Sequence, residues 1–171
     1  MKILLVSVAL FSLAAAADEA PARLVHSRDC ILRAVSQKMG ITLRAEVPLP
    51  PVFVASETPL QQFQDAIEAQ WGFRPDLIAN AYAARTNEIY LLDSAAYYRK
   101  HGRFIDDSLA HELVHYLQVR YQNADIRDGE WLEADAVMVQ TWFREEIMAK
   151  GLSPCPGQEA GIPRFFPIFP K

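Results

Sequence analysis

The sequence His111-Glu-Leu-Val-His115 constrains this chain more than any other feature. It lies in a helical pattern, because leucines recur every four residues from Leu109 to Leu117. Residues four apart lie on one face of a helix, with Cβ atoms about 5–6 Å apart, so the two imidazoles can bind one Zn²⁺. The Glu112 carboxylate lies just off that line, where it can reach a metal-bound water without ligating the metal. The motif therefore predicts a helix that holds a catalytic zinc ion.

A catalytic zinc normally has three protein ligands and one open position, so a third ligand is needed. The metzincin pattern would place glycine three residues and histidine six residues after His115, but this chain has Gln118 and Tyr121 there. The other common source is a carboxylate on a following helix. That helix offers three carboxylates within six residues, namely Glu130, Glu133 and Asp135. A carboxylate on the apolar side of a helix is rarely buried unless it is paired or bound to metal.

The run from Ser108 to Gln118, followed by Glu130-Trp-Leu-Glu-Ala-Asp135, resembles the gluzincin metallopeptidases. It is most similar to their small single-domain members, the minigluzincins, and the likeness covers about residues 81–150. In that family the third ligand often precedes a small residue, which implies Glu133, with Glu130 or Asp135 as alternative ligands or as partners of a ligating histidine. The resemblance implies a zincin-like fold and hydrolysis of peptide bonds, with Glu112 as the general base.

One feature departs from the family pattern. Larger gluzincins place an aspartate four residues after the ligand glutamate, where it supports the first histidine, and this chain has Val137 there. Gln118 lies one helical turn beyond His115, where it either lines the site or faces solvent. The family also uses a tyrosine or histidine to stabilise the oxyanion, and six residues are candidates: Tyr82, Tyr90, Tyr97, Tyr98, His101 and Tyr121.

The remaining patterns predict one α+β domain with a small antiparallel sheet, the active-site helix and a following long helix that holds the third ligand. Strands are expected at residues 41–47 and 52–54 and in a hairpin at 81–92. Helices are expected after Ser27 up to Gly40, from Pro59 to Gly72, over 94–99, after a cap at Asp106 or Asp107, and over 130–150.

Residues 1–17 have the pattern of a secretory signal peptide. Lys2 precedes an apolar run from Ile3 to Leu13, and four alanines end at Ala17. The run is shorter than the roughly 20 residues that span a bilayer, and no later segment is long and apolar enough to do so. We therefore expect cleavage near Ala17 and export to a periplasm or to the extracellular space. Residues 18–171 would form the catalytic domain, which ends in a tail rich in proline and phenylalanine.

Export also affects the interpretation of the two cysteines. In an oxidising compartment Cys30 and Cys155 are expected to form a disulfide, and neither has a neighbouring ligand at zinc spacing. The formal net charge of −4 argues against a nucleic-acid partner, so a peptide or protein substrate is expected. The alternative is a non-catalytic or latent zinc-binding protein of the same fold, with the tail over the cleft in the latent case. The sequence predicts no particular oligomeric state.

Overall fold

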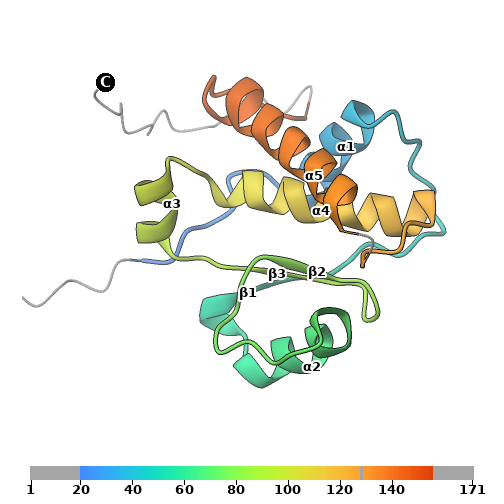
Figure 1. The fold of residues 1–171 in the computed structure, drawn as a ribbon. Coiled ribbons are helices and arrows are strands. Elements are labelled where there is room, and N and C mark those ends of the chain that lie inside the picture. The colour runs from blue at the N-terminus through green and yellow to red at the C-terminus, as the bar shows by residue number, and fades with distance from the viewer. Residues whose placement is uncertain (1–19, 128, 156–171) are drawn as a thin grey trace, which may run out of the picture.

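The computed structural model describes residues 20–127 and 129–155 (Figure 1). The predicted signal peptide and the tail after Cys155 lie outside the described residues. In chain order the elements are α1 (Arg28–Lys38), β1 (Val52–Val54), the 3₁₀ turn η1 (Ala55–Glu57), α2 (Leu60–Trp71), β2 (Ala81–Ala83), β3 (Glu88–Leu91), α3 (Ala95–His101), α4 (Ile105–Gln122), α5 (Glu130–Trp142) and the π-helical η2 (Phe143–Met148). The expected mixture of helices and a small sheet is confirmed.

The sheet is mixed, so the prediction of an antiparallel sheet was wrong. Its strand order is β1–β3–β2, in which β2 pairs antiparallel with β3 and β1 pairs parallel with β3. The β2–β3 pair is the expected hairpin, whereas a parallel neighbour needs a crossover connection of about a dozen residues or more. The segment that contains α2 provides that connection between β1 and the hairpin.

The sheet lies between α2 on one face and α4 on the other (Figure 1). Side chains alternate across it, as strand geometry requires. Tyr82 and Ile89 belong to the core cluster that includes α4, while Ala83 and Tyr90 pack with Phe63 of α2. The two-sided burial places β2 directly beside the helix that contains the histidine motif.

The helix α4 forms the centre of the domain, with α1 and α5 packed against it. Every residue from Ile105 to Gln118 is buried except His111. The helix begins at Ile105 and has Phe104 as its N-cap residue, so the predicted cap at Asp106 or Asp107 was wrong. Asp107 instead lies in the first turn and accepts the Phe104 N–H at 3.0 Å.

Several other local predictions can be compared with the structure. Ser27 caps α1 as expected, and Gly72, with φ of +76°, follows α2 in the left-handed conformation that suits glycine. Residues 41–47 do not form the predicted strand, because the chain turns where the Val47 N–H donates to the Arg44 carbonyl. The predicted 130–150 helix is continued beyond α5 as the π-helical η2.

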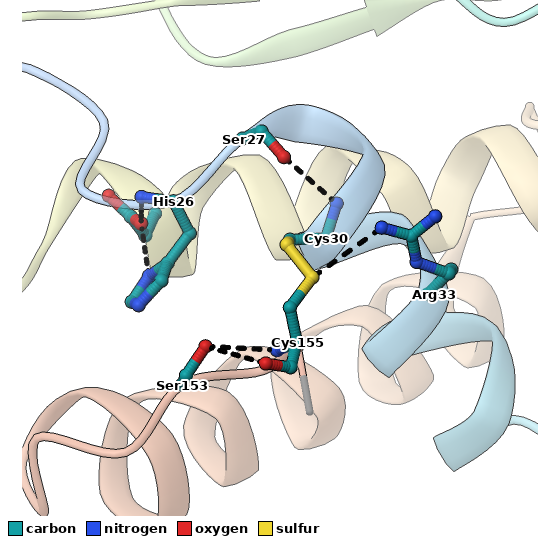
Figure 2. The surroundings of a disulfide bond; sticks show 7 residues. His26, Ser27, Cys30, Arg33, Ser153 and Cys155 are labelled. Carbon is teal, nitrogen blue, oxygen red and sulfur yellow. Dashed lines mark hydrogen bonds and ion pairs between the residues drawn. A yellow bond between two sulfur atoms is a disulfide. The ribbon is translucent and has the colours of Figure 1, made fainter. Parts of the chain in front are cut away.

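The predicted disulfide between Cys30 and Cys155 is present, with Cα atoms 5.4 Å apart (Figure 2). It joins the first turn of α1 to the chain that follows η2. The Ser27 hydroxyl caps the Cys30 N–H, and an Arg33 guanidinium nitrogen lies 3.5 Å from the Cys155 sulfur (Figure 2). Within the described residues, no helix combines the length and apolar character needed to cross a membrane.

Candidate metal centre

Three potential ligand atoms converge where α4 meets the start of α5. The Nε2 atoms of His111 and His115 lie 3.1 Å apart. The Glu133 carboxylate approaches both rings, with Oε1 3.5 Å from His111 Nε2 and Oε2 3.3 Å from His115 Nε2. The structure thus brings together the two motif histidines and the favoured third residue, in a group that could hold a metal ion.

The two histidine nitrogens are spaced much like ligands of a tetrahedral metal. Metal–ligand bonds of about 2.0–2.2 Å at tetrahedral angles place ligand atoms about 3.3–3.6 Å apart. The Nε2–Nε2 separation of 3.1 Å lies within about 0.2 Å of that range, and one ligand atom from each of the three residues lies within 4.8 Å of the others. Two imidazoles and one carboxylate are also a donor set that suits divalent transition metals, with a fourth position left for water or substrate.

The position of Glu133 on α5 explains why it, and not its acidic neighbours, joins the histidines. Leu132 and Ala136 belong to the buried face of α5, and Glu133 lies beside them at the margin of that face. Its side chain is 58% exposed, so it can reach the histidines while it borders solvent. Glu130 lines the cleft but does not belong to the group of convergent atoms. Asp135 neither lines the cleft nor belongs to that group.

Gln118 determines which ring nitrogen of His115 has a lone pair available to bind a metal ion. The Gln118 side-chain amide donates from Nε2 to the Leu132 carbonyl at 3.0 Å, so its oxygen faces the ring of His115. That oxygen lies 2.9 Å from His115 Nδ1, which must therefore be the protonated nitrogen that donates. The lone pair is left on Nε2, the atom that faces His111 and Glu133. Gln118 is fully buried, which excludes the solvent-facing alternative, and its contact with His115 places it beside the candidate site.

The second histidine has a different environment. His111 Nδ1 is buried and has no hydrogen-bond partner among the described residues. Burial lowers the pKa of His111, but the hydrogen bond with Glu133 and the negative charge of Glu112 and Glu133 outweigh it, so the pKa lies above its usual value. The negative charge that attracts a proton to this site in the absence of metal would equally attract a metal cation.

Glu112 lines the same cleft as the three potential ligands but is not one of them. Glu112 is only 4% exposed. Burial raises the pKa of the Glu112 carboxyl, while the two neighbouring histidines and a hydrogen bond from the Tyr82 backbone partly oppose that rise. A carboxylate with a raised pKa accepts a proton more readily, which suits a general base.

The cleft beside these residues has a volume of about 510 Å³. Its walls come from the end of α2, from β2, from α4 and from the start of α5: Gln70, Trp71, Asn80, Ala81, Tyr82, His111, Glu112, His115, Ile126, Gly129, Glu130, Leu132 and Glu133. Of the six oxyanion candidates, Tyr82 is the one that lines it within the described residues. The Tyr82 hydroxyl donates to Asn87 Oδ1 and accepts from Arg120 Nε.

Comparisons of this chain with protein-family models, with curated proteins and with solved structures found no match. The functional argument therefore rests on the geometry of the cleft. Sequence reasoning missed Gln70 of α2, which lines the cleft but is marked by no motif.

Proposed function

We propose that this chain is an exported zinc-dependent peptidase of the gluzincin type. The observation that supports this best is the convergence of His111, His115 and Glu133, whose ligand atoms lie within 4.8 Å of one another, next to the buried carboxylate of Glu112 in an open cleft. A structural metal site would need no second, non-ligating carboxylate in the cleft beside the three ligands. Export is supported by the disulfide, which is typical of proteins from oxidising compartments.

In the proposed reaction His111, His115 and Glu133 hold the zinc ion. When bound, zinc supplies Lewis-acid chemistry: it lowers the pKa of water towards 7 and polarises a carbonyl group. Glu112 accepts a proton from the water whose oxygen adds to the peptide carbonyl carbon. The carbon–nitrogen bond then breaks, and Glu112 returns the proton to the leaving nitrogen. Gln118 keeps His115 in the tautomer that can bind metal throughout this sequence.

The proposed substrate is a peptide in an extended conformation. The strand β2 is an edge of the sheet, and Ala81 and Tyr82 of that strand line the cleft beside Glu112. An edge strand presents backbone N–H and C=O groups that can pair with an added chain. A peptide that lay along β2 would bring its carbonyl groups close to the proposed metal ligands.

The alternative is a non-catalytic or latent zinc-binding protein of the same architecture. A purely binding role explains the three ligands but gives no reason to bury a second, non-ligating carboxylate, whose ionisation burial disfavours. The two possibilities differ in one measurable property, because the alternative predicts bound metal without peptide hydrolysis.

A set of four variants tests the proposed function. Glu112→Gln should retain about one zinc per chain and lose at least about a hundredfold in kcat against a peptide library. His111→Ala and Glu133→Ala should lose zinc, measured by elemental analysis of protein purified without added metal. Glu130→Gln is the matched control, because Glu130 lines the cleft outside the ligand group, and it should retain both properties. Full hydrolytic activity in Glu112→Gln would overturn the mechanism, and zinc without turnover in the unmodified protein would favour the alternative.

A further inference from the structure

The outer edge of β2 is already occupied by a side chain. Gln70, the penultimate residue of α2, donates from its amide nitrogen to the Tyr82 carbonyl at 3.1 Å. Its amide oxygen accepts the Ala84 N–H, also at 3.1 Å. The next backbone group along this edge, the Ala84 carbonyl, accepts from Arg120 at 2.9 Å. Three consecutive outward-facing backbone groups are therefore bonded to side chains rather than to a strand.

The Gln70 amide reproduces the hydrogen bonds of a neighbouring strand. A residue of a parallel strand donates to the carbonyl of one residue and accepts from the N–H two residues later. Gln70 makes this pair of contacts around Ala83, because its amide donates to the Tyr82 carbonyl and accepts from the Ala84 N–H. Because a side-chain amide has the same donor and acceptor as a peptide group, the edge is satisfied without a fourth strand.

This contact lies in the proposed substrate cleft. Gln70 lines the cleft together with Tyr82 and Glu112, so the end of α2 and the reactive residues border one cavity. Gln70 is only partly buried, and both of its bonds are to backbone groups at a sheet edge. A peptide backbone could exchange with such a side chain, because the peptide would restore the same two hydrogen bonds.

We propose that Gln70 is a specificity-determining residue that competes with extended peptides for the edge of β2. This inference rests on the proposed peptidase function and narrows its substrate class. A long extended peptide must displace the Gln70 amide before it can pair with Tyr82 and Ala84. A short peptide that does not reach the Tyr82 carbonyl and the Ala84 N–H leaves Gln70 in place. The contact therefore favours short peptides or chain ends over long extended segments.

A purely structural role predicts a different response. If Gln70 only fastened α2 to the sheet, its loss would lower stability and would not strengthen peptide binding. Gln64 is the matched control for that role. It also lies on α2 and donates its side-chain amide to a backbone carbonyl, that of Pro75 at 3.0 Å, but it does not line the cleft.

The test measures binding without turnover. Zinc-loaded protein with the Glu112→Gln substitution is titrated into a fluorescein-labelled decapeptide of alternating threonine and valine with terminal lysines, and into the corresponding tetrapeptide. Adding Gln70→Ala should tighten decapeptide binding about five- to tenfold, because the peptide no longer displaces one or two hydrogen bonds. Tetrapeptide binding should stay within about twofold. Gln64→Ala should change neither dissociation constant by more than about twofold.

Unchanged or weaker decapeptide binding by Gln70→Ala would overturn the proposal. Gln70→Glu provides a second variant, because a carboxylate keeps the acceptor for Ala84 N–H but loses the donor to Tyr82 O. It should tighten decapeptide binding by about two- to threefold. If the unmodified protein hydrolyses no peptide, the peptidase function fails, whereas the Gln70 proposal is decided by these dissociation constants alone.

Discussion

Replacement of Gln118 by methionine should weaken both the fold and the metal site. Gln118 is fully buried and makes two contacts, with His115 Nδ1 at 2.9 Å and with the Leu132 carbonyl at 3.0 Å. Leu132 directly precedes the proposed ligand Glu133, so one side chain connects both parts of the centre. Methionine has similar length and flexibility but neither the donor nor the acceptor.

The size of the expected loss of stability follows from the polar groups that lose a partner in Gln118→Met. A buried donor without its partner costs about 1–3 kcal/mol, and Gln118→Met leaves the His115 Nδ1–H in that state. The Leu132 carbonyl loses one of its two bonds, because its place in α5 provides a helical N–H partner as well. We expect the free energy of unfolding of the metal-free protein to fall by about 1–3 kcal/mol. Loss of the group that orients a ligating histidine typically weakens metal affinity by about 10–100-fold.

Three measurements separate these effects. Urea unfolding followed by circular dichroism gives the change in stability, and zinc competition with a chromophoric chelator, under conditions where both proteins are folded, gives affinity. Nitrogen-15 NMR of the imidazole gives the tautomer, which should be Nδ1–H for His115 in the unmodified protein. Gln118→Glu keeps the acceptor for His115 and should preserve that tautomer while it loses the Leu132 contact. Unchanged zinc affinity and an unchanged His115 tautomer in Gln118→Met would refute the reasoning.

Two further predictions concern the fold alone. The double substitution Cys30→Ala/Cys155→Ala should lower the free energy of unfolding by about 3–5 kcal/mol, measured by urea unfolding, because the disulfide spans 125 positions of sequence. Unchanged stability would contradict this. Burial raises the pKa of Tyr98 to about 12, and its hydroxyl donates to the Leu92 carbonyl at 2.6 Å. Since the fold favours the neutral phenol, its stabilising effect is complete below pH about 10 and is lost as the pH rises towards about 12. The melting temperature of Tyr98→Phe should therefore decline less steeply than that of the unmodified protein between pH about 10 and about 12. An identical decline in the two proteins would contradict this prediction.

The histidine pair of the candidate site could be predicted from sequence because His111 and His115 share a helix face by spacing alone. The acidic stretch at the start of the next helix offered three carboxylates, among which the resemblance to the gluzincins favoured Glu133. Gln118 and Gln70 could not be predicted in the same way. Their partners, the Leu132 carbonyl and the edge of β2, belong to other elements and come close only through tertiary packing.

The errors in the predicted fold have similar physical causes. Residues 41–47 have the alternation of a strand, but a strand also needs a neighbour, and the turn between Arg44 and Val47 leaves the segment without one. The parallel pairing of Val52–Val54 with Ile89–Leu91 likewise depends on how α2 returns the chain across the sheet. Local patterns describe the elements well, but they do not specify how distant elements pair.

The burial of α4 explains why its polar residues differ in role. A surface helix keeps polar side chains on its solvated face, whereas α4 is buried around nearly its whole circumference up to Gln118, so each polar group on it needs a partner. Asp106 accepts two backbone N–H groups of the N-terminal segment, Asp107 accepts the amide of Gln140 on α5, and Gln118 joins His115 to α5. These three connect α4 to its surroundings. Glu112 likewise accepts a hydrogen bond from the Tyr82 backbone of β2, but it also lines the cleft, with a pKa raised by burial. Unlike Asp106, Asp107 and Gln118 it borders an open cavity, as the proposed role of general base requires.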